Sequence, residues 1–121
     1  MGSYATLQQM GVLDGRERQG IIINNQFISY FQVESVLHCY PKVLEAGVIV
    51  KCNKGENEIL KVYLALEETF QNEAEKERYC SEVEQYIRQK FSFQIPISVL
   101  IREKLPMTKS GKILRSVLYD Y

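Results

Sequence analysis

Two stretches of the sequence alternate apolar and polar residues, residues 43–52 and residues 59–66. A period of two is the pattern of a half-buried β-strand. The segment between them is polar and contains Gly55, so the two strands are expected to form an antiparallel hairpin. Residues 97–101 are mostly apolar and follow Pro96, and they predict a further strand.

A helical period appears in two other stretches. Residues 30–40 fit a helix, with Ser29 as its N-cap and Pro41 as its stop. Its apolar positions are Phe31, Val33, Val36, Leu37 and Tyr40. Over residues 72–91, apolar side chains recur every four positions, at Tyr79, Val83, Ile87 and Phe91. Charged side chains occupy the other face, so this segment predicts an amphipathic helix that covers a sheet.

The order of these elements predicts the fold class. Residues 21–23 and 27–30 are β-prone and flank Asn24 and Asn25, which tolerate positive φ, so a small hairpin is expected there. A short helix should end the chain after Lys112. The whole pattern predicts an α+β fold: a small mixed three-stranded sheet flanked by helices, plus an N-terminal two-stranded β-hairpin.

The length of 121 residues is enough for one domain. Residues 1–14 have a weak pattern and are expected to be a leader or an inter-domain linker, and residues 15–121 a single domain. Lys plus Arg and Asp plus Glu number 15 each, so a zero net charge argues against a general nucleic-acid binder and a polybasic membrane surface. The pattern shows neither an apolar run long enough to span a bilayer nor a signal peptide, so we expect a cytoplasmic protein.

Cysteine and histidine usage predicts no metal site. The three cysteines Cys39, Cys52 and Cys80 are far apart in the sequence and form no CxxC pair, which favours reduced, buried thiols over disulfides or zinc. His38 is the only histidine, and we expect it to be partly buried on a helix.

The motif with the most chemical content is Pro-x-Thr-x-Ser-Gly-Lys-x-x-Arg, formed by Pro106, Thr108, Ser110, Gly111, Lys112 and Arg115. Pro106 has a fixed φ and Gly111 can take a positive one, so the loop presents Lys112 as an aimed charge. Taken alone, the pattern also fits a plain surface turn before a helix. A nucleotide-binding P-loop is excluded, because Pro106 stands where that motif needs Gly and Ile113 where it needs Ser or Thr.

A second stretch changes the balance between these two interpretations. Gly15-Arg16 runs into an isoleucine-rich strand, and Glu34 follows in the next helix. Together with the Lys112 motif, this arrangement resembles the C-terminal domain of the adenylate-forming superfamily, which includes acyl-CoA synthetases, luciferin-type ligases and the adenylation domains of nonribosomal peptide synthetases. The resemblance extends from about Gly15 to Leu118. It implies a mobile lid that works on a large N-terminal domain.

The resemblance also implies roles for individual residues. Lys112 would be the catalytic lysine of carboxylate adenylation and Arg16 a nucleotide contact. Arg18 falls on the hinge, where Asp or Lys is more common. The turn of the thiol channel would be Asn24, Asn25 and Gln26, with the asparagines in place of a glycine pair. Thr108, Ser110, Gly111 and Arg115 would support the loop. Residues 32–34 retain only the second glutamate of the usual pair, Glu34.

The implied cofactors and partners lie largely outside this chain. ATP with Mg²⁺ would be bound mainly by the N-terminal domain, present in cis or in trans, and CoA or a phosphopantetheine thiol would accept the acyl group. An acyl or peptidyl carrier protein is a further candidate partner. The chain alone is expected not to turn over. Two alternatives stay open: a free-standing, non-catalytic module that binds a carrier protein or a ligase, and an unrelated α+β domain with a chance Ser-Gly-Lys loop.

Overall fold

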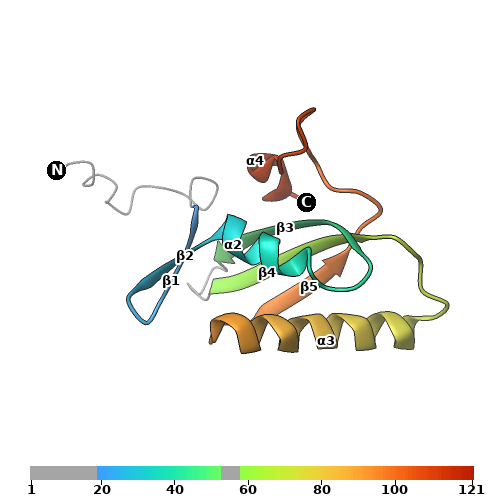
Figure 1. The fold of residues 1–121 in the computed structure, drawn as a ribbon, viewed down its shortest axis with the longest axis horizontal. Coiled ribbons are helices and arrows are strands. Elements are labelled where there is room, and N and C mark those ends of the chain that lie inside the picture. Colours follow the sequence, from blue (N-terminus) through green and yellow to red (C-terminus); the bar gives the residue numbers. More distant parts are fainter. Residues whose placement is uncertain (1–18, 53–57) are drawn as a thin grey trace.

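The computed structural model describes residues 19–52 and 58–121 (Figure 1). The expected linker over residues 1–14 and the turn over residues 53–57 lie outside them. The elements follow in the order β1 (Gly20–Ile23), β2 (Gln26–Ser29), α2 (Tyr30–Leu37), β3 (Val43–Cys52), β4 (Glu58–Leu66), α3 (Glu73–Phe91), β5 (Ile97–Ile101) and α4 (Arg115–Leu118).

Two separate sheets organise the domain. The larger has the strand order β3-β4-β5, with β3 antiparallel and β5 parallel to β4. Val62 at its centre pairs with Val48 on one side and Val99 on the other. β1 and β2 form the smaller, antiparallel sheet. The predicted fold class, a mixed three-stranded sheet with helices and an N-terminal hairpin, is therefore confirmed.

Local chemistry explains the β1–β2 hairpin and the start of α2. Asn24 and Asn25 have φ values of 51° and 66°, so both asparagines adopt the left-handed conformation that a tight hairpin turn needs. The Ser29 hydroxyl accepts a hydrogen bond from the Gln32 N–H at 3.1 Å, and the Gln32 side chain accepts one from the Ser29 N–H at 2.8 Å. This reciprocal capping box confirms Ser29 as the N-cap.

α2 is shorter than its pattern predicts. It ends at Leu37 rather than near Tyr40, because the amides of Cys39 and Tyr40 bond to carbonyls three residues back and tighten the chain into a turn. His38 consequently lies exposed after the helix, not partly buried on it. Phe31, an apolar position of the helical pattern, is 73% exposed.

The three-stranded sheet is covered on both faces. Alternate residues of β3 point in opposite directions: Val48 and Val50 join the core formed with α2 and α3, whereas Ile49 joins a second, smaller core under the C-terminal segment. Figure 1 shows α3 along one side of the sheet and α4 on the other. The short α4 thus belongs to a layer of its own, and this layer carries the Lys112 motif.

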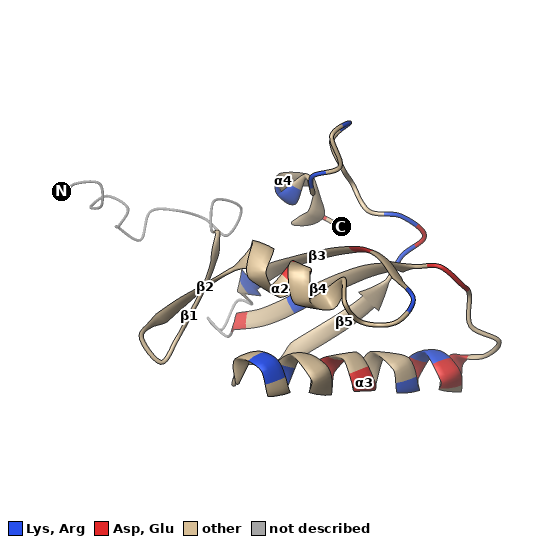
Figure 2. Ribbon diagram, viewed as in Figure 1, with Lys and Arg blue, Asp and Glu red and all other residues tan. Residues whose placement is uncertain are grey.

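α3 covers its side of the sheet as its pattern predicts. Val83 and Ile87 are fully buried, and Asn72 caps the first turn by accepting a hydrogen bond from the Glu75 N–H at 2.8 Å. Charged side chains line the helix, whereas β1 and β2 carry none (Figure 2). Burial raises the pKa of the Tyr79 phenol to about 12.

The cysteines are free, as expected, but the prediction that they are buried is wrong, because none of the three is fully buried. Cys39 and Cys52 are exposed because they lie in the turn after α2 and at the end of β3, and Cys80 is half-buried. Among the described residues, no group of three or more His, Cys, Asp or Glu side chains could hold a metal ion. No helix in the same part of the chain combines the length and apolarity that crossing a bilayer requires.

Candidate functional site

The Lys112 motif forms a small closed loop, residues 106–114, called here the lysine loop. Thr108 holds it together: its N–H donates to the Lys112 carbonyl at 2.7 Å, and its side-chain oxygen accepts the Lys112 N–H at 3.0 Å. The Ser110 hydroxyl lies 3.0 Å from the same Thr108 oxygen. Gly111 has a φ of 90°, and a side chain there would meet open space, so backbone conformation rather than crowding requires glycine.

The base of the lysine loop is a short antiparallel ladder. Met107 pairs with Ile113, and the Leu114 N–H donates to the Pro106 carbonyl at 2.9 Å. These internal hydrogen bonds give the loop a defined shape. The side chains of Lys109 and Lys112 are both exposed, and neither forms an ion pair with another described residue.

Apolar packing attaches the lysine loop to the sheet. Leu105 is 5% exposed, and its N–H donates to the Glu45 carboxylate at 3.0 Å. On the other side of the loop, Ile113 and Leu118 lie over Gly47 of β3. A Cβ at Gly47 would come within 3.0 Å of Leu118 and 3.1 Å of Ile113, so glycine permits this close approach.

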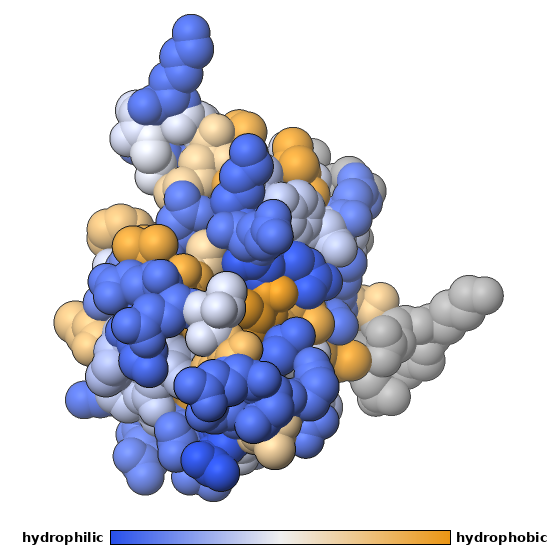
Figure 3. All heavy atoms as spheres, turned by 90° about the vertical axis from the view of Figure 1, so that its right-hand side faces the viewer, coloured by the Kyte–Doolittle hydropathy of each residue, from blue (hydrophilic) through white to orange (hydrophobic). Residues whose placement is uncertain are grey.

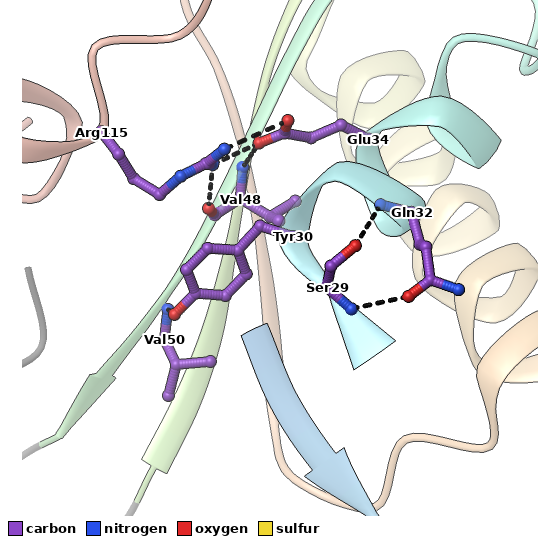
Figure 4. Close-up of polar contacts among 7 residues, drawn as sticks. All are labelled: Ser29, Tyr30, Gln32, Glu34, Val48, Val50 and Arg115. Carbon is purple, nitrogen blue, oxygen red and sulfur yellow. Dashed lines mark hydrogen bonds and ion pairs between the residues drawn. The ribbon is translucent and has the colours of Figure 1, made fainter. Parts of the chain in front are cut away.

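A buried ion pair makes the polar attachment (Figure 4). Arg115 donates to both carboxylate oxygens of Glu34 and, through Nη1, to the Val48 carbonyl at 2.8 Å. Glu34 also accepts the Val48 N–H at 3.0 Å. The Arg115 guanidinium lies 4.9 Å from the centre of the Tyr30 ring, whose hydroxyl accepts the Val50 N–H at 3.0 Å. Side chains from α2 and α4 therefore provide hydrogen-bond partners for the backbone groups of Val48 and Val50 at the edge of β3.

A cavity of about 440 Å³ separates α2 from the lysine loop. Phe31 and His38 line it from α2 and the turn after it, and Lys112 and Arg115 line it from the C-terminal segment. Glu34 also contributes to its wall. The cavity brings the candidate lysine and the buried ion pair to the same hollow.

A second hollow, of about 510 Å³, lies where β4 and β5 end beside the start of α3. Leu66, Phe70 and Ile101 line it together with charged side chains such as Arg102. Figure 3 faces this end of the molecule and shows an apolar patch framed by hydrophilic side chains. Of the predicted site residues that the structure describes, none lines this hollow.

The other predicted site residues either fall outside the described part of the chain or lie away from the lysine loop. Arg16 and Arg18 lie outside the described residues. The predicted thiol-channel turn, Asn24, Asn25 and Gln26, is exposed at the end of the β1–β2 hairpin, well away from the C-terminal segment (Figure 1). Two separate surfaces therefore carry the residues expected for the two halves of the reaction.

Glu34 is the residue whose importance the sequence pattern understated. Among the described residues, Glu34 is the charged residue that is buried, with an exposure of 7%. Its pairing with Arg115 spans 81 positions, and no local pattern announces such a contact. The available signals were its position between apolar residues of a short helix and its place in the motif that carries the family resemblance.

Known proteins resemble this chain over most of its length. The acetyl-coenzyme A synthetase of Bacillus subtilis is 34% identical over 120 residues, which cover 97% of this chain and 20% of that protein. The mitochondrial acyl-coenzyme A synthetase ACSM4 of Rattus norvegicus is 30% identical over 107 residues, 88% of this chain and 18% of its own length. The chain thus spans about one fifth of the curated relatives that it matches.

Solved structures share the fold. McyG A-PCP complexed with phenylalanyl-adenylate has a TM-score of 0.71 at 22% identity, covering 86% of this chain and 19% of that one. The o-succinylbenzoate CoA synthetase of Bacillus subtilis, bound with a product analogue, has a TM-score of 0.63 at 27% identity, covering 87% and 21%. The family model described as "AMP-binding enzyme C-terminal domain" matches residues 32–112, more than half of the sequence. The chain therefore belongs to the AMP-binding enzyme C-terminal domains of the adenylate-forming superfamily.

Proposed function

We propose that this chain is the lid of an AMP-forming acid–thiol ligase and that Lys112 is its catalytic lysine. The observation that carries the proposal is an exposed lysine on a loop whose shape is held by its own hydrogen bonds to Thr108. Such a lysine can reach a substrate beyond the surface of its own domain without any rearrangement of the loop. The names of the relatives, which are CoA synthetases, support the reaction class.

The chemistry explains why a lysine is needed. In adenylation a carboxylate oxygen attacks the α-phosphorus of ATP, a new oxygen–phosphorus bond forms, and pyrophosphate leaves. Two anionic groups must approach each other, and a cation placed between them stabilises the transition state. An ammonium on a flexible four-carbon stem is suited to this position, because it can contact oxygens of both groups.

The nucleotide itself would be held mainly by another domain. Among the described residues that line the cavity beneath the lysine loop, the Arg115 guanidinium is already paired with Glu34, so Lys112 is the cation left to contact the phosphates. These residues fit a lid that completes a nucleotide site rather than one that forms it. Arg16 is proposed as a further nucleotide contact, and Mg²⁺ would be bound with ATP at the large domain, neutralising phosphate charge.

The acceptor half of the reaction is assigned to the β1–β2 hairpin. Its exposed turn, Asn24, Asn25 and Gln26, belongs to an uncharged surface that could border a channel for a phosphopantetheine thiol or CoA. Because the hairpin turn and the lysine loop lie apart on the domain, the lid would have to rotate between the two half-reactions, with Arg18 at the hinge. One similar structure is an A-PCP protein, which supports a carrier protein as a further partner.

The proposed partner domain would complete the enzyme. The chain covers about one fifth of its relatives, so an adenylating domain in cis or in trans is expected to supply the remainder. The chain alone is predicted to show no ligase turnover. One relative is named mitochondrial, and the cytoplasmic location of this protein stays a prediction.

A pair of lysine variants in the complete ligase tests the proposal. Lys112→Ala should lower ATP–pyrophosphate exchange by about 10²- to 10³-fold, the range seen when one group that stabilises charge in a transition state is removed. It should leave thioester formation from supplied acyl-adenylate intact. Lys109→Ala removes an equally exposed charge from the same loop and should change neither reaction. Wild-type exchange by Lys112→Ala would refute the assignment, and exchange by the isolated chain would refute its predicted inactivity.

A further inference from the structure

The burial of the Glu34 carboxylate in this domain requires a physical explanation. Glu34 lies on α2, is 7% exposed, and contacts Val48 of β3 and Arg115 of α4. Removing a carboxylate from water costs free energy unless partners replace the lost hydration, and apolar side chains of similar volume often stabilise a fold as well as an ion pair does. The pair with Arg115 is therefore poorly explained by stability alone. What it does provide is a directional attachment.

Glu34 and Arg115 are both attached to the edge of β3, at Val48. Val48 presents both its N–H and its carbonyl away from β4. Glu34 accepts from the N–H, and Arg115 donates to the carbonyl while holding Glu34 with both terminal nitrogens. The ion pair thus occupies the place of a neighbouring strand at this residue. The hydrophobic effect is not directional, whereas these bonds define one position of Arg115 along β3.

Arg115 lies three residues after Lys112, directly beyond the base of the lysine loop. The internal hydrogen bonds of the loop determine its shape, and its two ends determine where that shape is placed. The Leu105–Glu45 hydrogen bond holds the first end, and the Arg115 bonds hold the second. Displacement of Arg115 along β3 would carry Lys112 with it.

We infer that Glu34 is a positioning residue for adenylation, which acts through Arg115 to place Lys112. The inference rests on the proposed role of Lys112. Without the Glu34 charge the loop keeps its shape but takes several positions relative to β3. A smaller fraction of the molecules then places Lys112 correctly. The adenylation kcat falls, because misplacement of a catalytic group by about 1 Å can cost about 10²-fold. The acceptor half-reaction, assigned to a separate surface, is spared.

Glu34→Gln in the complete ligase is the first test, because glutamine keeps the size and can still accept the Val48 N–H. We expect a fall of about 10- to 100-fold in the kcat of ATP–pyrophosphate exchange, with the KM for ATP and the thioester half-reaction unchanged. Glu84→Gln is the matched control: it breaks the ion pair with Arg88 on α3, far from the loop, and should leave every rate unchanged. Equal losses in both half-reactions for Glu34→Gln would reduce Glu34 to a structural role and overturn the inference.

A double variant isolates the route of the effect. If Glu34 acts only through Lys112, then Glu34→Gln combined with Lys112→Ala will be no slower than Lys112→Ala alone. A further fall would overturn the inference. Arg115→Lys, which keeps the charge but loses the two-nitrogen contact, should reproduce the loss seen with Glu34→Gln and keeps the test open if Glu34→Gln does not fold.

Amide hydrogen exchange separates this inference from the proposed function. In Glu34→Gln, exchange should quicken at the Val48 amide, which donates to the Glu34 carboxylate, while the internally bonded amides of the lysine loop and the amides of α3 stay at the wild-type rate. If Lys112→Ala leaves adenylation unchanged, the proposed function fails, while quickened exchange at Val48 would still support the attachment of Glu34 and Arg115 to β3. Unchanged exchange at Val48 would overturn that attachment whatever the activities are.

Discussion

Leu118 is the side chain on which the docking of the C-terminal layer should depend most. It is fully buried, in a small core with Ile49, Tyr63, Ala65 and Leu105. Leu118→Ala removes three carbons, worth about 0.8 kcal/mol each in transfer free energy, and leaves a cavity that adds to the loss. Such substitutions cost about 2–5 kcal/mol. We expect about 2–3 kcal/mol, because α4 has only four residues and can partly collapse into the space.

Urea unfolding followed by circular dichroism measures this cost directly. With an m value of about 1.5 kcal/mol per molar, the midpoint for Leu118→Ala should fall by about 1.3–2 M while m stays constant. Val117→Ala is the matched control, because Val117 precedes it in the same helix but is 45% exposed. Its effect should stay within about 0.5 kcal/mol.

Two results would refute this reasoning. A cost below about 1 kcal/mol for Leu118→Ala would mean that the side chain is not packed as deeply as its burial indicates. A cost for Val117→Ala as large as that for Leu118→Ala would mean that Val117 packs more closely than its 45% exposure indicates, because alanine is the better helix former and cannot weaken α4 through helix propensity.

Two further predictions concern close packing and pH. Gly47→Ala would force Ile113 and Leu118 to shift by a few tenths of an ångström, so we expect a loss of about 1 kcal/mol and a Tm lower by about 4 °C in a thermal scan; an unchanged or higher Tm would contradict it. Burial, followed by nearby ionisable groups, raises the pKa of Tyr79 from 10.0 to about 12, and its hydroxyl donates to the Pro41 carbonyl. The phenol is therefore more easily ionised when unfolded, and its contribution to stability, complete below pH 10, is lost as the pH rises from about 10 to 12. Tyr79→Phe should remove that part of the pH dependence in unfolding experiments, and an unchanged slope would refute the assignment.

The sequence pattern was most informative where structure is decided locally. The alternation over β3 and β4, the four-residue period of α3 and the Ser29 cap all depend on residues near in sequence, and each was confirmed. It was least informative at element ends. α2 stops before its apolar pattern does, and Phe31 is exposed although it follows that pattern, because a periodicity does not say which face has a partner.

The candidate site divides in the same way. The lysine loop was readable from the sequence, since Pro106, Thr108 and Gly111 act on neighbouring residues within one turn. The roles of Lys112, Arg16, Arg18 and the hairpin turn stay predictions, because the substrates and the partner domain that would define them lie outside this chain.

The amino-acid sequence by itself determined the order of strands and helices, the shape of the lysine loop and the family of the domain, because propensity, capping and turn chemistry act over a few residues. Only the tertiary structure decided where that loop is held. Glu34 and Arg115 are 81 positions apart, and Gly47 meets Leu118 across two layers. Such contacts arise when packing brings distant segments together, and the pattern of neither segment records its partner.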